Sequence, residues 1–295
     1  TLMKTMPPHL KEDTPLDPLS TFRIGGKARY LYRVTSREEL RDAFLFCSQH
    51  DLPYFILGKG SNILFDDKGF GGVVILNSLT TLSHDKTTYT VAAGHSFSHL
   101  GTFTARHNMS GLEFAAGIPA SLGGAIYMNA GAHRQNVSDT LQWVDYMHDN
   151  GELQRFTKEE LTFGYRYSSF HNMKGAILQA SFSLTSNDEA LSLQKDMLAS
   201  RMSSQPYDLP SAGCVFRNPS SEQSAGKLIE GCGLKGLSIG GATISDKHAN
   251  FIVNTGSATS SDVCSLIAHI QEKVYKNTGI TLKREICIMP YLPKS

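Results

Sequence analysis

Apolar residues in the first third of the chain indicate strands and a helix in close succession. Residues 28–34 form a largely apolar run of strand length, and residues 36–39 read Ser-Arg-Glu-Glu, a capping box that marks the start of a helix. Apolar side chains then recur at helical spacing, at Leu40, Ala43, Phe44 and Cys47. Pro53 ends that unit, and short apolar runs at 54–57 and 73–76 predict buried strands.

The remaining two thirds mix strands and helices without a regular order. Strands are predicted at 141–148 and 176–184, followed by a connecting helix at 191–202. A helix starting at Ser261 and a strand at 285–289 end the chain. The helix has an apolar face formed by Val263, Leu266, Ile267, Ile270 and Val274. Because strands and helices do not alternate as in a doubly wound sheet, the predicted fold class is α+β.

Composition excludes several classes of protein. A chain of 295 residues can hold two or three domains, and a net charge of +1 without Lys/Arg clusters argues against nucleic-acid binding and a polybasic membrane patch. No apolar run approaches the roughly 20 residues of a membrane span, and the first ten residues lack a signal-peptide core. The five cysteines are odd in number and lack C-x-x-C spacing, so we expect no disulfide framework, no metal site and a cytoplasmic protein.

Glycine is the informative excess, and one short glycine segment follows a predicted strand. Residues 58–62 read Gly-Lys-Gly-Ser-Asn, which would free backbone amides to face an anion. The segment lacks the G-K-[ST] ending of a Walker loop and is not G-x-G-x-x-G. Taken alone, it is better explained as a plain strand-to-helix turn.

A second glycine segment, residues 117–133, is much longer. Pro119 restricts its own φ, while Gly117, Gly123 and Gly124 allow unusual backbone conformations. Small residues continue to Ala132, so a flat ring or a diphosphate could lie against the backbone. A tight structural loop or closely packed helix is the alternative, but the length of the run favours ligand binding.

Three polar segments carry candidate chemistry. Tyr165 and Arg166 lie side by side and suit an anionic substrate, although a surface strand is the better explanation if the segment is taken alone. Residues 211–219 place Cys214 among polar groups, where a working thiol and a buried apolar cysteine are about equally plausible. Glu285 heads an apolar strand, where a carboxylate is normally a surface residue.

Read in order, these motifs resemble one family. G-K-G-S-N, G-I-P-x-S-x-G-G-A-x-x-M-N-A-G-A, Y-R-x-S, S-A-G-C-V-F-R-N-P, A-G-K-L-I-E, K-H-A-N-F-I-V-N and R-E-I together are similar to the UDP-N-acetylenolpyruvoylglucosamine reductases, usually called MurB. The similarity runs from about Ser20 to the last strand. The uninterrupted stretch 165–183 leaves no room for an extra tyrosine-bearing loop, so the chain resembles the second, shorter subtype.

The resemblance implies a fold and a domain plan. The fold would be the FAD-binding fold of the vanillyl-alcohol-oxidase/PCMH type with a C-terminal α+β substrate-binding domain. Residues 1–75 and 76–186 would form two FAD-binding subdomains, and 187–285 the substrate domain. The last strand, within 286–295, would return to the first subdomain.

The resemblance also implies the reaction. It is the NADPH-dependent, FAD-mediated reduction of UDP-N-acetylglucosamine enolpyruvate to UDP-N-acetylmuramate, a step of peptidoglycan precursor synthesis. Arg166 would stabilise the enolate that builds up on the substrate, with help from Glu285. Cys214 stands at the family's proton-donor position, where many relatives have serine. A thiol, with an unperturbed pKa of about 8.5, is a far stronger acid than a serine hydroxyl.

The remaining site residues are carried over by position. The cofactor would be held by Gly58, Lys59, Gly60, Ser61, Asn62, Gly117, Ile118, Pro119, Ser121, Gly123, Gly124, Asn129, Ala130 and Gly131. The substrate would be bound by Tyr165, Arg217, Asn218 and Lys227. Lys59 and Ala120 replace glycines of many relatives, and Ala120 puts the FAD affinity in question. We expect a monomer. Another flavin oxidoreductase on the same fold, or a non-catalytic flavin- or nucleotide-sugar-binding protein, is the alternative.

Overall fold

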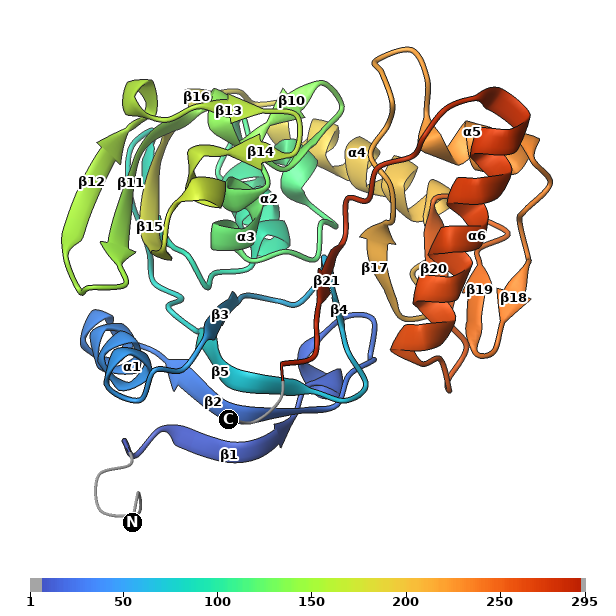
Figure 1. The fold of residues 1–295 in the computed structure, drawn as a ribbon. Helices are drawn as coiled ribbons and strands as arrows, with labels where there is room; N and C mark the ends of the chain where they lie inside the picture. The colour runs from blue at the N-terminus through green and yellow to red at the C-terminus, as the bar shows by residue number, and fades with distance from the viewer. Residues whose placement is uncertain (1–6, 293–295) are drawn as a thin grey trace. The chain divides into compact units, whose positions relative to one another are not determined.

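The computed structural model describes residues 7–292, which fall into two compact units. The first unit contains residues 30–59 and 72–201 together with the stretch that precedes Asp13. The second contains residues 13–29, 60–71 and the chain from Met202 onward. Figure 1 shows the elements of both units, and each unit is described here by itself.

A five-stranded antiparallel sheet dominates the first unit. Its order is β12-β11-β15-β7-β6. The strands are β6 (Leu82–Asp85), β7 (Thr88–Ala92), β11 (Leu141–His148), β12 (Leu153–Thr157) and β15 (Gly175–Ser183). The helices of this unit are α1 (Arg37–Gln49), α2 (Phe97–Arg106), α3 (Leu122–Tyr127) and most of α4 (Ala190–Ser204). Short pairs complete it: β8 (Met109–Ser110) with β16 (Thr185–Ser186), β9 (Gly131–Ala132) with β10 (Gln135–Asn136), and β13 (Phe163–Gly164) with β14 (Tyr167–Ser168).

A second sheet has the order β1-β2-β5-β3. Its strands are β1 (Leu10–Pro15), β2 (Lys27–Val34), β3 (Tyr54–Leu57) and β5 (Phe70–Asn77). Helix α1 begins as the capping box predicts, because the Ser36 hydroxyl accepts the Glu39 N–H at 3.1 Å. Its apolar face, which includes Leu40 and Phe44, joins a buried cluster with residues of β2 and β5.

The second unit is built around a four-stranded sheet, β17-β20-β19-β18, and the long helix α6. The strands are β17 (Ser211–Cys214), β18 (Ser238–Ile239), β19 (Ala242–Ile244) and β20 (Phe251–Asn254), and the helices are α5 (Ala225–Gly231) and α6 (Ser260–Thr278). The residues predicted to form the apolar face of the last helix are all buried on α6. The last strand, β21 (Cys287–Met289, red in Figure 1), pairs in parallel with β4 (Ile63–Phe65).

Most predicted elements occur where the sequence places them, and the mixed order confirms the α+β class. Two local expectations differ. Residues 58–62 connect strand β3 to strand β4 rather than a strand to a helix. The last strand starts at Cys287 rather than at 285, because the amides of Glu285 and Ile286 both point to the carbonyl of Val215 instead of entering the ladder. No helix between residues 7 and 292 is long and apolar enough to span a membrane.

Candidate active site

The two glycine segments approach each other within the first unit. Gly58 leaves β3 at a point where an added Cβ would collide with the Ser121 hydroxyl. That hydroxyl caps α3 by accepting the Gly124 N–H at 3.2 Å. Segments about sixty residues apart in sequence are therefore in van der Waals contact, and only glycine fits at position 58.

The long glycine segment is anchored on its inner side. The Gly117 N–H donates to Ser98 Oγ at 2.8 Å, and the Gly123 N–H donates to the Ala93 carbonyl at 2.8 Å. Gly117 has φ +86°, which favours glycine. Pro119 and Gly124 are exposed, so residues 117–124 present backbone and small side chains at the surface. Ala120 is not among the residues with positive φ, so its methyl group causes no backbone strain.

Arg166 is brought to the end of this segment by a hairpin. Strands β13 and β14 pair Gly164 with Tyr167, which leaves Tyr165 and Arg166 at the turn rather than on a plain surface strand. Arg166 has φ +53°, its guanidinium reaches the Gly131 carbonyl at 3.5 Å, and it lies 5.1 Å from the Tyr165 ring centroid. The first unit thus unites Gly131, Tyr165 and Arg166.

The side chain of Asn129, a residue predicted to contact the cofactor, is hydrogen-bonded to this hairpin. It is buried, and its Nδ2 donates to the Gly164 carbonyl at 2.9 Å while its Oδ1 accepts the Ser138 N–H at 3.3 Å. An amide that donates and accepts at once is what these two positions require. In the structure, the side chain of Asn129 supports the turn that carries Arg166.

In the second unit, Thr21 joins two of the predicted segments. Its N–H donates to the Gly60 carbonyl at 3.0 Å, and its hydroxyl donates to the Ser211 carbonyl at 2.7 Å. Gly60 has φ +65°, and a Cβ there would strike the carbonyl of Leu19. Sequence reasoning missed Thr21, because no local pattern marks a threonine whose partner lies 190 positions away.

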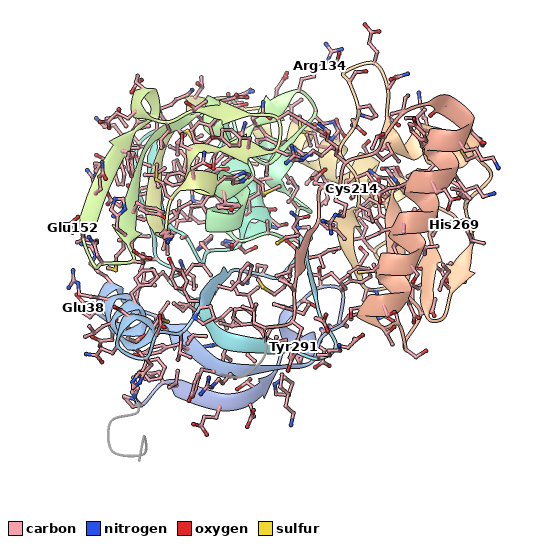
Figure 2. The ribbon with its side chains drawn as sticks, in the orientation of Figure 1. Glu38, Arg134, Glu152, Cys214, His269 and Tyr291 are labelled. Atoms are coloured by element: carbon pink, nitrogen blue, oxygen red, sulfur yellow. The ribbon has the colours of Figure 1, made fainter. Side chains whose placement is uncertain are left out.

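Cys214 is the last residue of β17 (Figure 2), is half-buried and forms no disulfide. Gly213 before it has φ +73°, and the β17–β20 ladder shifts register between Ser211 and Cys214. This shift ends regular pairing at Cys214, which faces Phe251 across the ladder. The next residue, Val215, donates its N–H to the Asn250 carbonyl at 2.8 Å.

Glu285 lies beside the same segment. Its N–H donates to the Val215 carbonyl at 2.8 Å, so one residue connects the backbones of Cys214 and Glu285. Asn62 holds Glu285 from the other side, since its Nδ2 donates to the Glu285 carbonyl at 3.2 Å. The Asn62 carbonyl in turn accepts the Cys287 N–H at 2.9 Å. Asn62, predicted as a cofactor contact, thus positions the backbone of Glu285.

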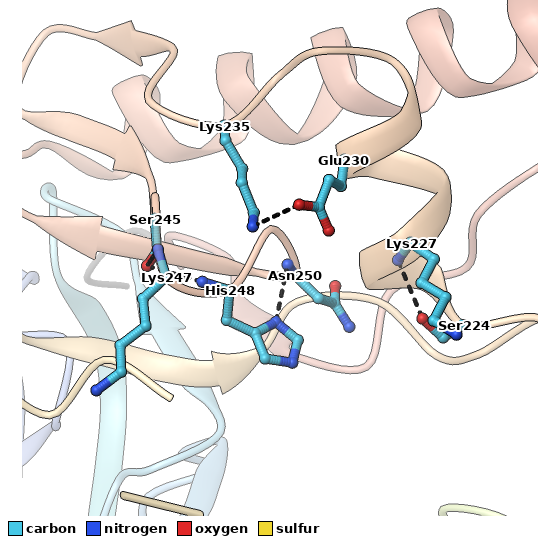
Figure 3. Close-up of polar contacts among 8 residues, drawn as sticks. All are labelled: Ser224, Lys227, Glu230, Lys235, Ser245, Lys247, His248 and Asn250. Atoms are coloured by element: carbon cyan, nitrogen blue, oxygen red, sulfur yellow. Dashed lines mark hydrogen bonds and ion pairs between the residues drawn. The ribbon is translucent and has the colours of Figure 1, made fainter. Parts of the chain in front are cut away.

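The expected substrate residues are all in the second unit, apart from Tyr165. The Arg217 N–H donates to the Lys283 carbonyl at 2.9 Å. Asn218 Oδ1 accepts the Ala225 N–H at the start of α5 at 3.0 Å, and Lys227 is exposed in the first turn of that helix. Ser224 caps the turn through the Lys227 N–H at 3.0 Å (Figure 3). The start of α5 therefore brings Asn218 and Lys227 together.

A polar cluster lies beyond α5 in the same unit. Lys235 Nζ pairs with Glu230 Oε1 at 2.7 Å, and His248 Nδ1 accepts the Asn250 N–H at 3.1 Å (Figure 3). Burial, reinforced by the nearby Lys235 charge, lowers the pKa of His248 below its usual 6.5. Among residues 7–292, no three His, Cys, Asp or Glu side chains converge as metal ligands would.

Comparisons with known proteins match both parts of the chain. A family model described as "FAD binding domain" matches residues 28–157, and one described as "UDP-N-acetylenolpyruvoylglucosamine reductase, C-terminal domain" matches residues 205–289. The reductase of that name from Protochlamydia amoebophila is 50% identical, with 94% of this chain and 92% of that protein covered. The Chlamydia trachomatis serovar L2 reductase is 45% identical, with 97% and 98% covered.

The chain belongs to the UDP-N-acetylenolpyruvoylglucosamine reductase family. A solved structure of this reductase (MurB) from Thermus caldophilus is 37% identical, with a TM-score of 0.82 over 95% of this chain and 98% of that one. The expected fold, a FAD-binding domain with a MurB C-terminal domain, is confirmed. The chain is a flavoprotein oxidoreductase that uses FAD and NADPH, and its 295 residues fit the shorter MurB subtype.

The residues of the first unit fit FAD. A side chain at position 58 would fill the space between Gly58 and Ser121. A Cβ added at Gly123 would lie 3.1 Å from the Ala93 methyl carbon. The exposed surface of residues 117–124 offers backbone groups and small side chains rather than carboxylates. Such a surface admits a dinucleotide close to the backbone and does not repel its diphosphate.

Proposed function

We propose that this MurB-family chain reduces UDP-N-acetylglucosamine enolpyruvate to UDP-N-acetylmuramate, using Arg166, Cys214 and Glu285. One observation supports this assignment most strongly. Val215 donates to Asn250 and accepts from Glu285, so the backbone of the proposed carboxylate is hydrogen-bonded to the residue that follows the proposed proton donor, Cys214. An acid and a carboxylate that serve one substrate need such a fixed relative position.

FAD, when bound, would supply the chemistry by which a hydride from NADPH reaches the vinyl carbon of the enolpyruvyl group. The chain's own part is to hold charge and to deliver a proton. Arg166 would stabilise the negative charge that builds up on the carboxylate side of the substrate, because its guanidinium stays charged at all working pH values. The hairpin turn and the Gly131 carbonyl support its guanidinium in this role.

Cys214 would donate the proton to the carbon adjacent to the reduced one. It is half-buried and follows Gly213, and the backbone after it is held by the hydrogen bonds of Val215. Glu285 would assist through a hydrogen bond or by carrying a proton. A general acid acts only when it lies within hydrogen-bond reach of the atom it protonates, so both Cys214 and Glu285 would have to lie close to the substrate.

The remaining expected residues take binding roles in this proposal. Residues of 58–62 and 117–131 would hold FAD, with Asn62 and Asn129 acting on the supporting backbone. Tyr165, Arg217, Asn218 and Lys227 would bind the anionic nucleotide sugar, for which positive charge and amide donors are suited. We further propose that the enzyme is a monomer that works in the cytoplasm, where its cysteines, none of which forms a disulfide, would stay reduced.

The decisive experiment measures coupling of NADPH oxidation to the sugar. The purified protein should be yellow, and NADPH absorbance should fall rapidly only when UDP-N-acetylglucosamine enolpyruvate is present. UDP-N-acetylmuramate should appear in equal amount. NADPH consumption that does not depend on the sugar would overturn the proposal. Size-exclusion chromatography with light scattering checks the monomer.

The Cys214→Ala variant tests the proton donor. It should still let NADPH bleach the flavin, because that step needs no thiol, while re-oxidation by the sugar substrate should slow by roughly 10²–10⁴-fold, the range that general acid–base catalysis contributes. Rapid-mixing absorbance measurements separate the two steps. Fast re-oxidation in Cys214→Ala would remove Cys214 from the mechanism.

A further inference from the structure

We propose that Asn250 is a positioning residue that fixes Cys214 relative to Glu285 by clamping the two residues that follow the cysteine. The inference rests on the role proposed for Cys214. Asn250 immediately precedes β20 and is 3% exposed. In this role Asn250 would not contact the substrate, and it would act only through the backbone of residues 215 and 216.

Three hydrogen bonds connect Asn250 to this backbone. The side-chain Nδ2 donates to the Phe216 carbonyl at 2.9 Å, and Oδ1 accepts the Phe216 N–H at 3.0 Å. The main-chain carbonyl of Asn250 accepts the Val215 N–H at 2.8 Å. A single residue thus satisfies both polar groups of Phe216 and one of Val215, all of them in buried positions.

The clamp stands where regular pairing stops. The β17–β20 ladder shifts register before Cys214 and ends at the Cys214–Phe251 pair. The amide of Asn250 then supplies one donor and one acceptor side by side, as the backbone of a paired strand would. The Asn250 amide therefore holds the backbone that follows Cys214, although the strand pairing has ended there.

The restraint also reaches Glu285. The Val215 carbonyl accepts the Glu285 N–H at 2.8 Å, and Phe216 forms an isolated bridge with Arg284. If residues 215 and 216 moved, the positions of Cys214 and Glu285 would change together. A displacement of about 1 Å at a reacting group can lower a rate on the order of a hundredfold.

The turn before Asn250 holds it in place. The Ser245 hydroxyl accepts the N–H groups of Lys247 and His248 at 3.1 and 3.2 Å, and His248 Nδ1 accepts the Asn250 N–H at 3.1 Å. Figure 3 shows these residues together on the stretch between β19 and β20. Asn250 is therefore fixed at its own backbone before it fixes Phe216.

Asn254, at the other end of β20, is a matched control. It is 4% exposed, donates Nδ2 to the Phe22 carbonyl at 3.0 Å and accepts the N–H groups of Gly256 and Ala258 at 2.9 and 3.1 Å. It therefore resembles Asn250 in burial and in hydrogen bonding. Its side-chain partners are Phe22, Gly256 and Ala258, none of which belongs to residues 211–217 or 284–286.

The experiment compares Asn250→Ala, Asn254→Ala and Cys214→Ala in the FAD-loaded protein. One readout is the rate at which iodoacetamide alkylates Cys214, followed by peptide mass spectrometry with Cys232 as internal reference. The other is the pair of half-reactions in rapid-mixing absorbance. Both asparagine variants should lose thermal stability to a similar extent. Only Asn250→Ala should change the Cys214 alkylation rate, and this change should be several-fold. The same variant should slow re-oxidation of the flavin by the sugar by roughly ten- to a hundredfold. Flavin reduction by NADPH should be unchanged.

Equal behaviour of Asn250→Ala and Asn254→Ala in both readouts would overturn the inference. If Cys214→Ala re-oxidises at the wild-type rate, the proposed role of Cys214 fails, and the alkylation rate alone decides whether Asn250 positions the thiol. Asn250→Asp serves if the alanine variant does not fold. Because it keeps an acceptor for the Phe216 N–H but turns a carboxylate oxygen toward the Phe216 carbonyl, it should show the same changes in the Cys214 alkylation rate and in re-oxidation.

Discussion

The hydrogen bond that His248 makes to Asn250 depends on the protonation state of the imidazole. Its Nδ1 accepts the Asn250 N–H, which an imidazolium cannot do because both of its ring nitrogens carry hydrogen. Burial lowers the pKa of His248, the Lys235 charge lowers it further, and Glu230 opposes these effects only in part. The folded protein therefore favours neutral imidazole with its hydrogen on Nε2, and stability becomes dependent on pH.

The sign of that dependence follows from the lowered pKa. In the unfolded chain His248 binds a proton near its usual pKa of 6.5, whereas the folded chain binds it only at lower pH. The free energy of unfolding should therefore decrease as the pH falls below about 6.5, until the folded imidazole is protonated as well. Urea unfolding at pH 7.5 and 5.5 measures this for the wild type and His248→Gln. A glutamine keeps an acceptor but does not titrate, so the variant should lose less stability over this interval. An identical loss in both proteins would contradict the assignment.

At the level of elements, three neighbouring strands of the first unit share one charged row. Asp145 on β11 stands opposite Arg155 on β12 and Gln179 on β15. Arg155 contacts both carboxylate oxygens at 2.7 and 3.0 Å, and Gln179 donates to the second at 2.9 Å. Burial alone would raise the pKa of Asp145, but the hydrogen bonds from Arg155 and Gln179 outweigh it, and the pKa is lowered. The row stabilises the register of these strands.

Arg155→Ala should lower the free energy of unfolding by about 1 kcal/mol at pH 7, the upper end for an exposed ion pair with two-point geometry. The pKa of Asp145 lies below its usual 3.8, so the contribution is present above that pH and is lost as the pH falls through the folded value. Urea unfolding at pH 7 and pH 3, followed by circular dichroism, should show a smaller difference from the wild type at pH 3 than at pH 7. Arg155→Lys should recover part of it, because lysine keeps the charge without the fork. An equal loss at both pH values would rule out the carboxylate as the source.

At the level of the whole molecule, the candidate residues are distributed over both units. Gly58, Lys59, residues 117–131 and the Tyr165–Arg166 turn belong to the first unit. Residues 60–62, Cys214, the residues near α5 and Glu285 belong to the second. The dividing point falls between Lys59 and Gly60, inside one five-residue motif. The motif thus supplies Gly58 to the contact with Ser121 and Asn62 to the backbone of Glu285.

Gly58→Ala should lower the flavin content of the purified protein. The added methyl group would displace the Ser121 hydroxyl, which would give up its cap on Gly124 at a cost of about 1 kcal/mol. The ratio of flavin to protein absorbance measures retention, and urea unfolding measures stability. Gly231→Ala is the control, since nothing besides its chain neighbours and the backbone of its own helix lies within 4 Å of the added Cβ, and its φ is not positive. Full flavin occupancy in Gly58→Ala would show that the Gly58–Ser121 contact is unimportant for the cofactor.

Local patterns predicted the elements well and the supporting contacts poorly. Ser36 and the apolar spacing after it place α1, because this signal is complete within a few positions, and β11 also lies at the residues expected. The order of motifs identified the family, and the resemblance named Arg166, Cys214 and Glu285 as candidates. Thr21, Asn62 and Asn250 act through partners 190, 223 and 34 positions away. Such pairings arise only from the folded backbone, so their roles could not be read from the chain.

Trp143 gives the first unit a built-in optical probe. It is the only tryptophan, and the Arg155 guanidinium lies 3.6 Å from its ring centroid. Its emission therefore comes from one known place, the seam between β11 and β12. Release of the guanidinium would expose the indole face to water and shift the emission to longer wavelength. Fluorescence of the unmodified enzyme would follow the opening of this seam, without an attached dye.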